Sequence, residues 1–448
     1  MQRLLIKNAT LVNENQCRIA DVRIVGERIE VIGQSLSAQT GEQIIDASGL
    51  HLFPGVIDDQ VHFREPGLTH KGNIQSESRA AVAGGITSFM EMPNVNPQTT
   101  TLDALEEKYQ RAAGRAFANH SFYLGATNDN LEVIKSLDPN AACGVKIFMG
   151  ASTGNMLVDD EAVLTGIFAN SPVLIATHCE NTPMIQQLET QYKAQYGENI
   201  PMQMHAEIRS REACYQSSST AIALAKKNGA RLHVLHLTTA EELNQFPAIT
   251  DLSQLAQATV TAEACVHHLW FNKDDYATLG AQIKCNPSIK LRSDQLALQQ
   301  AVNDDRIAVI ATDHAPHTWS EKQNSYFNAP SGLPLVQHML PALLELYHQG
   351  VFTLERIVRK TAHAVAERYQ LKDRGYIREG YFADLTLVDL NQSVTVNPDN
   401  ILYHCGWSPF NGQSFRSAVT TTLVNGQLVW HQGAIQSQAN GQRLTFNR

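Results

Sequence analysis

The sequence lacks any long hydrophobic run. Its longest apolar stretches, such as residues 307–311, fall far short of the roughly 18 apolar residues that a membrane-spanning helix needs. The first residues lead at once into an amphipathic pattern, without the apolar core and small-residue cleavage site of a secretory signal. We therefore expect no membrane span and a cytoplasmic location.

Basic residues are also in short supply. The 448-residue chain has 35 lysines and arginines against 44 aspartates and glutamates, a formal net charge of −9, and no block of Lys or Arg. Since nucleic-acid-binding surfaces need basic clusters, we expect no nucleic-acid partner. Closely spaced cysteine pairs are missing too: the seven cysteines contain no C-x-x-C motif, so we expect reduced thiols.

Both ends of the chain alternate between apolar and polar residues, as half-buried β-strands do. The strand-like segments are residues 4–12, 21–33, 383–389 and 419–430. In the last of these, Asn425-Gly426 is a hairpin-turn signal. Because neither end can bury both faces of its strands alone, we expect residues 1–52 and 376–448 to combine into one small β-sandwich domain.

The middle of the chain alternates short apolar segments with helical ones. The strand candidates are residues 53–62, 86–92, 121–126, 144–149, 173–178, 232–237, 258–264 and 307–312. Eight is the number of strands that a closed (β/α)₈ barrel requires. The helical segments between them favour parallel βα units over a meander. We therefore predict an α/β fold in which residues 53–375 form a (β/α)₈ barrel of the TIM type.

Several of the predicted barrel strands carry an ionisable side chain at or near the carboxyl end, where the active site of such a barrel forms. These residues are His62, Lys146, His178, His236 and Asp313. A single histidine in an apolar strand is more often a hydrogen-bonded core residue than a ligand. Burying all five together without a counter-ion would leave polar groups unsatisfied. The pattern predicts a divalent-metal site, with Zn²⁺ preferred and Mn²⁺, Co²⁺ or Fe²⁺ as alternatives.

Lys146 is the unusual member of this set. An ammonium group in the apolar segment 144–150 loses hydration and repels a cation. One interpretation is that its amine reaches solvent or pairs with a carboxylate. The other is that a lowered pKa lets the neutral amine take up CO₂, and the resulting carbamate is an anionic ligand able to bridge two metal ions.

Four longer motifs carry a resemblance to a known family. They are residues 54–67 (PGVIDDQVHFREPG), 92–97 (MPNVNP), 311–317 (ATDHAPH) and 405–410 (CGWSPF). Through them the whole chain resembles the cyclic amidohydrolase superfamily and, within it, the dihydroorotases. The resemblance implies a hydrolase that interconverts N-carbamoyl-L-aspartate and L-dihydroorotate, the third step of de novo pyrimidine biosynthesis.

The resemblance also implies roles for individual residues. The implied ligands of one or two Zn²⁺ ions are His62, carboxylated Lys146, His178, His236 and Asp313, and Asp313 also takes and returns the catalytic proton. The implied substrate-binding residues are Arg64, Asn94 and His317 for the carboxylate and Asn286 for the ureide ring. Because a guanidinium pairs with a carboxylate through two parallel hydrogen bonds, Arg64 favours dihydroorotate over the neutral substrates of hydantoinases and allantoinases.

Gln60 departs from the family pattern Asp-x-His-x-His. The amide that replaces the first imidazole could coordinate a metal weakly through its carbonyl oxygen, hydrogen-bond a metal-bound water, or do neither. A mononuclear site built from the later strands is one interpretation. Compensation by Asp59, His267 or His268 is another.

The sequence leaves two other functions open. A hydantoinase or allantoinase would share the fold and the metal, and Arg64 with Asn94 and His317 argues against it. A catalytically inactive dihydroorotase-like partner of aspartate transcarbamoylase is supported only by Gln60. A homodimer and an association with aspartate transcarbamoylase are the candidate assemblies. Residues 320–335 could cover the pocket as a mobile loop or form a static connection.

Overall fold

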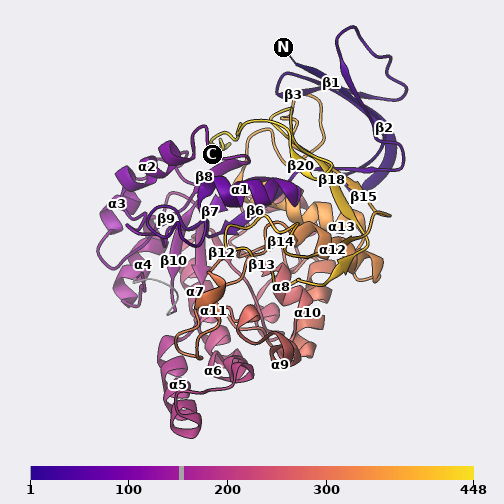
Figure 1. The fold of residues 1–448 in the computed structure, drawn as a ribbon. Coiled ribbons are helices and arrows are strands. Elements are labelled where there is room, and N and C mark those ends of the chain that lie inside the picture. The colour runs from indigo at the N-terminus through magenta and orange to yellow at the C-terminus, as the bar shows by residue number, and fades with distance from the viewer. Residues whose placement is uncertain (1, 151–155) are drawn as a thin grey trace.

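Eight parallel strand positions form a barrel. The strands of one parallel sheet are β6 (Val56–Val61), β7 (Ile86–Glu91) and β8 (Asn119–Phe122). Those of a second are β9 (Leu124–Gly125), β10 (Val145–Phe148), β11 (Ile175–His178), β12 (Leu232–Val234), β13 (Val260–Cys265) and β14 (Val309–Ala311). Only Tyr123 separates β8 from β9, so the two share one strand position. The computed structural model describes residues 2–150 and 156–448 (Figure 1).

The barrel closes between its first and last strands. The amide of His62, just after β6, donates a hydrogen bond of 2.7 Å to the carbonyl oxygen of His314, just after β14. Val61 and His314 also form a parallel bridge. All eight predicted strands are therefore present, most of them with shorter bounds.

Helices alternate with these strands along the chain, as βα units require. They are α1 (Ile74–Ala83), α2 (Leu102–Ala112), α3 (Leu131–Lys135), α4 (Glu161–Asn170), α5 (Thr182–Tyr196), α6 (His205–Ile208), α7 (Arg211–Asn228), α8 (Val266–Trp270), α9 (Tyr276–Leu279), α10 (Arg292–Asn303), α11 (Trp319–Lys322), α12 (Met339–His348), α13 (Leu354–Val358) and α14 (Ala364–Tyr369). The longest, α7, begins where the Ser210 side chain accepts a hydrogen bond from the Ala213 amide and ends at Gly229, whose φ is 67°. In residues 2–150 and 156–448, no helix is long and apolar enough to span a membrane.

Both ends of the chain contribute to a separate, mostly antiparallel sheet. Its strands are β1 (Arg3–Asn13), β2 (Gln16–Val25), β3 (Arg28–Gly33), β4 (Gln43–Asp46), β5 (His51–Pro54), β15 (Leu385–Asp389), β18 (Ala418–Val424), β19 (Gln427–His431) and β20 (Ala434–Ile435). The central pairing of β5 with β15 joins the two contributions, so indigo and yellow strands lie together in Figure 1. A barrel with a small β domain is thus the observed fold, as predicted. The domain bounds 1–52, 53–375 and 376–448 stay a prediction.

The first barrel strand begins later than the sequence suggested. Residues 53 and 54 belong to β5 of the terminal sheet, and the chain passes through Gly55 before β6 starts at Val56. A Cβ atom at Gly55 would lie only 2.2 Å from the hydroxyl oxygen of Thr87. Glycine is therefore required where the chain crosses from the sheet into the barrel.

The end of the chain returns to the barrel after leaving the terminal sheet. The guanidinium of Arg448 donates hydrogen bonds to the carbonyl oxygens of Pro139, Ala142, Cys143 and Tyr369. A short pair of strands, β16 (Val394–Thr395) and β17 (Ser414–Phe415), lies in the connection between β15 and β18 of the terminal sheet. The carboxyl-terminal part of the chain therefore contacts the barrel as well as the sheet.

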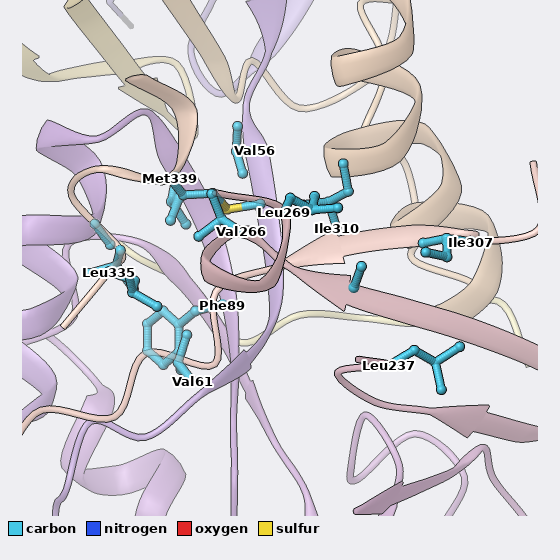
Figure 2. Close-up of a cluster of buried hydrophobic side chains, with 14 of the residues drawn as sticks. Val56, Val61, Phe89, Leu237, Val266, Leu269, Ile307, Ile310, Leu335 and Met339 are labelled. Atoms are coloured by element: carbon cyan, nitrogen blue, oxygen red, sulfur yellow. The ribbon is translucent and has the colours of Figure 1, made fainter. Parts of the chain in front are cut away.

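Buried aromatic and aliphatic side chains pack around the barrel strands (Figure 2). Phe89 on β7 is fully buried, and its ring lies 4.5 Å from that of Phe63, centroid to centroid.

We expect Phe89→Ala to lower the free energy of unfolding by about 3–5 kcal/mol, because it leaves a cavity in close-packed surroundings. Urea denaturation followed by circular dichroism measures this. Ile19→Ala is the control: Ile19 is 65% exposed, and its loss should change stability by less than about 0.5 kcal/mol.

Candidate functional site

A polar pocket forms where the barrel strands end. Its lining residues are Gln60, His62, Arg64, Asn94, Lys146, Phe148, His178, His236, Asn286, Asp313, Ala315, Ser331 and Gly332. Every predicted site residue except His317 therefore lines this pocket. These residues come from strand ends that are far apart in sequence, so the fold alone makes them neighbours.

Three of the lining residues have a backbone conformation that is uncommon outside glycine. Arg64, His236 and Asp313 have φ angles of 73°, 40° and 50°. Each follows the end of a barrel strand, where a left-handed residue turns the chain sharply. Such a conformation costs of order 1–3 kcal/mol and persists only where the surroundings enforce it, which is typical of functional sites.

His178 and His236 face each other in the pocket. Nδ1 of His178 lies 3.1 Å from Nε2 of His236, and Nε2 of His178 lies 3.0 Å from a carboxylate oxygen of Glu180. Burial lowers the pKa of both histidines, which keeps the imidazoles neutral and able to act as ligands. Two ligands of one tetrahedral ion at 2.0–2.1 Å are about 3.3 Å apart, close to the observed separation.

Glu180 holds His178 in this orientation. By accepting a hydrogen bond from Nε2 of His178, its carboxylate leaves Nδ1 unprotonated and facing the pocket. Glu180 is also paired with Arg209 at 2.5 Å. Burial alone would raise the pKa of Glu180, but Arg209 and His178 outweigh it and lower the pKa to about 2. Sequence analysis missed Glu180, and its only signal was a carboxylate two residues after a candidate ligand.

His62, Gln60 and Asp313 form the opposite side of the pocket. Nδ1 of His62 lies 2.8 Å from the amide oxygen of Asn94, and Nε2 lies 3.1 Å from Oδ1 of Asp313. When Nδ1 donates to Asn94, a proton or a metal cation must lie between Nε2 and the carboxylate, because two bare acceptors would repel each other.

Gln60 hydrogen-bonds a candidate ligand. Its Nε2 donates to Oδ1 of Asp313 at 3.1 Å. A register shift between Asp58 and Val61 accompanies this placement and indicates a bulge in β6. Burial raises the pKa of Asp313, but His62 outweighs it and leaves the pKa below its usual value. The amide at position 60 therefore points its donor, rather than its carbonyl oxygen, at an ionised carboxylate.

Lys146 lies on β10 beside the strand that carries His178. It is 1% exposed, and its amine lies 4.8 Å from the centre of the Phe148 ring. Burial lowers the pKa of Lys146 to about 8. The neutral amine, which is the form that reacts with CO₂, is therefore more populated near neutral pH than it is in an exposed lysine.

Arg64 places a buried cation at the pocket. Its guanidinium donates to the carbonyl oxygen of Pro316 at 3.1 Å and lies 3.0 Å from Nε2 of His317. Burial lowers the pKa of Arg64 to about 10, so the group stays charged at neutral pH. His317 therefore contacts Arg64 from outside the lining, and its expected contact with the substrate carboxylate stays a prediction. Asn286 does line the pocket, with a buried amide oxygen that has no hydrogen-bond partner in the described chain.

The residues suggested as substitutes for the missing imidazole do not line this pocket. The Asp59 carboxylate accepts a hydrogen bond of 2.8 Å from the hydroxyl of Tyr369. Nε2 of His268 lies 3.1 Å from the carbonyl oxygen of Pro287, and His267 packs against His268 with ring centroids 4.0 Å apart.

Two buried lysines hold the segment 320–335 in place. The Lys322 amine donates to the carbonyl oxygens of Lys284, Pro330 and Gly332, at 3.2, 2.9 and 2.8 Å. The Lys284 amine donates to those of Tyr326 and Ala329, at 2.5 and 2.6 Å. These bonds fix the loop that brings Ser331 and Gly332 to the pocket, and so favour a static connection over a lid.

Comparison with known proteins shows the family. The model of the amidohydrolase family matches residues 51–429, and the chain belongs to this family. It is 33% identical over 429 residues to a dihydroorotase of Halobacterium salinarum, covering 95% of this chain and 96% of that protein. It is 30% identical over 451 residues to an allantoinase of Desulfitobacterium hafniense, covering 98% of each.

Solved structures agree with this assignment. An L-hydantoinase from Arthrobacter aurescens superposes with a TM-score of 0.91 at 27% identity, over 99% of this chain and all of that one. A dihydropyrimidinase from Brevibacillus agri gives 0.89 at 25% identity, over the full length of both. The chain is thus a cyclic amidohydrolase, in a family that is generally metal-dependent. Relatives with different substrates match it similarly, so the substrate must be argued from the pocket.

The Glu180–His178 contact leads to a test of metal binding. We expect Glu180→Gln to weaken Zn²⁺ binding about 10–100-fold, because the orienting carboxylate of a ligating histidine has been removed. Competition with a chromophoric chelator measures the affinity. Glu198→Gln, at an exposed position, is the matched control. Unchanged affinity in Glu180→Gln would contradict a metal-ligand role for His178.

Proposed function

We propose that this protein is a dihydroorotase, which interconverts N-carbamoyl-L-aspartate with L-dihydroorotate and water. The observation that carries the proposal is the buried, charged guanidinium of Arg64 at a pocket with ligating side chains. The partners described above for Arg64 are a carbonyl oxygen and an imidazole, and neither is an anion.

The electrostatics of Arg64 favour a substrate with a carboxylate. Burial of a guanidinium is costly, and the charges of Asp313, Glu91 and Glu321 offset that cost in part. A substrate carboxylate that accepts two parallel hydrogen bonds would offset it further. Dihydroorotate carries such a group, whereas hydantoin and allantoin do not. Asn94 lines the same pocket and offers an amide next to His62. Together these groups support dihydroorotate over the neutral substrates of the related enzymes.

The donor set fits one or two divalent cations. His62, Lys146 as its carbamate, His178, His236 and Asp313 would hold them, because these imidazoles are neutral and Asp313 is ionised. A divalent cation supplies Lewis-acid stabilisation of negative charge and lowers the pKa of water to near neutrality. Gln60 contributes to this set through its hydrogen bond to Asp313.

Asp313 is suited to move the proton of the reaction. As an ionised carboxylate it accepts the proton of the attacking water at Oδ1 or Oδ2, then returns it to the departing ring nitrogen when the C–N bond breaks. General acid–base catalysis of this kind contributes about 10²- to 10⁴-fold in rate. In the synthetic direction the same carboxylate takes the proton from the ureide nitrogen.

The other lining residues orient the substrate. Arg64 and Asn94 fix the carboxylate, and Asn286, whose buried amide oxygen is free to accept a hydrogen bond within the described chain, binds the ureide ring. Holding the ring carbonyl in a near-attack geometry lowers the entropic cost of the reaction. The surviving ligating side chains favour an active enzyme over an inactive partner of aspartate transcarbamoylase.

Substrate choice tests the role of Arg64. We expect the wild type to turn over L-dihydroorotate in preference to allantoin and hydantoin. Arg64→Gln should lower kcat/KM for dihydroorotate about 10- to 100-fold, the value of a charge-assisted hydrogen bond of 1.5–3 kcal/mol. Steady-state assays on all three substrates measure this, with exposed Arg79→Gln as the control. Faster turnover of allantoin or hydantoin by the wild type would reject the dihydroorotase proposal.

Two variants test the carbamate proposed on Lys146 and the role of the Gln60 amide. We expect Lys146→Ala to abolish activity, because no neutral amine is left to form the carbamate ligand. Gln60→His should retain activity, since an imidazole restores the usual family ligand. Turnover and metal content are measured on the same preparations, and the carbamate of the wild type is detected by NMR after incubation with ¹³C-labelled bicarbonate. Full activity in Lys146→Ala would count against the carbamate.

A further inference from the structure

A second group of ligating side chains lies inside the barrel, outside the pocket lining. Asp59 on β6, His233 on β12 and Glu263 on β13 are all fully buried. One possible ligand atom from each lies within 4.8 Å of the other two. The mechanism above uses none of the three.

Each residue of this group is anchored by one polar atom. The hydroxyl of Tyr369 donates to Oδ2 of Asp59 at 2.8 Å. Nδ1 of His233 lies 2.7 Å from the hydroxyl oxygen of Thr261. Oε1 of Glu263 accepts a hydrogen bond of 3.0 Å from the backbone amide of His236. The side chains are therefore oriented by contacts outside the group.

Each of the three side chains also has a buried polar atom that makes no hydrogen bond within the described residues. Oδ1 of Asp59, Nε2 of His233 and Oε2 of Glu263 are buried and have no hydrogen-bond partner within the described residues. An unsatisfied buried polar atom typically costs about 1–3 kcal/mol, and a buried charge costs more. Three such atoms in one place therefore point to a ligand.

The charges and distances specify the kind of ligand. In the described part of the chain, Nε2 of His233 lies 3.4 Å from Oδ2 of Asp59 and 3.8 Å from Oε2 of Glu263. Two carboxylates thus share one imidazole, and a divalent cation would neutralise them. Ligands of a tetrahedral ion at 2.0–2.2 Å are about 3.3–3.6 Å apart, close to these separations. One imidazole and two carboxylates form a donor set that suits a divalent transition metal.

We infer that Asp59, His233 and Glu263 bind a divalent transition-metal cation in the barrel core, separate from the pocket. Because Glu263 also accepts the amide hydrogen of His236, the cation would hold the left-handed turn that aims His236 at the pocket. The site is thus a structural one that positions a candidate ligand of the pocket. The competing occupant is a proton shared among the same three side chains.

Anomalous scattering from crystals of the wild type, grown with Zn²⁺, locates the ion directly. We expect a peak at the zinc absorption edge in contact with Asp59, His233 and Glu263, in addition to density at the pocket. A peak at the pocket alone would overturn the inference and leave the proposed function standing. A peak in the core alone would support the inference and count against the proposed function. This measurement requires no variant to fold.

Metal content gives an independent answer in solution. In His178→Ala/His236→Ala, which lacks two pocket ligands, we expect about one Zn²⁺ per chain to survive gel filtration, bound in the core. Adding Asp59→Asn should remove it, whereas adding Asp58→Asn, a buried neighbour that bonds Thr312 instead, should not. Circular dichroism verifies folding in each case. Absence of zinc from the folded double variant, or its retention after Asp59→Asn, would overturn the inference.

Discussion

Closure of the barrel is the constraint on which the site depends. The hydrogen bond from the amide of His62 to the carbonyl oxygen of His314 joins the first barrel strand to the last. It places His62 beside Asp313, although 251 residues separate them along the chain. The other strands add Lys146, His178 and His236 around the same centre. Without closure of the barrel, these side chains would not line the same pocket.

Within the closed barrel, several buried polar and charged groups are not fully matched by hydrogen-bond donors or opposite charges of the described residues. At the pocket, neutral imidazoles and an ionised carboxylate meet without enough donors, and Arg64 is charged without an anionic partner among its described contacts. In the core, two carboxylates share His233. Each of these sites therefore favours the binding of a ligand of opposite charge, because a bound ion or substrate would supply the missing charge. The left-handed backbone conformations of Arg64, His236 and Asp313 are also unfavourable by themselves, and they persist because the surrounding structure enforces them.

Much of this was predictable from local pattern. The strand-to-helix rhythm identified eight barrel strands, and the candidate ligands near the strand ends identified part of the pocket lining. The predictions were less accurate where the chain changes partner: residues 53 and 54 pair with β15 of the terminal sheet, which no local signal distinguishes from the start of a barrel strand. His317 is a predicted substrate contact that is absent from the pocket lining and lies 3.0 Å from the Arg64 guanidinium, a contact that no local pattern indicates.

The sequence by itself determined the fold class, the family resemblance and the identity of the strand-end residues, because alternation, spacing and motif are local properties. Only the tertiary structure decided that Glu180 orients His178, that Gln60 directs its amide to Asp313, and that buried lysines hold segment 320–335. It also decided which polar atoms lack partners. Those outcomes depend on distances between residues remote in the chain, and such distances exist only after the barrel has closed.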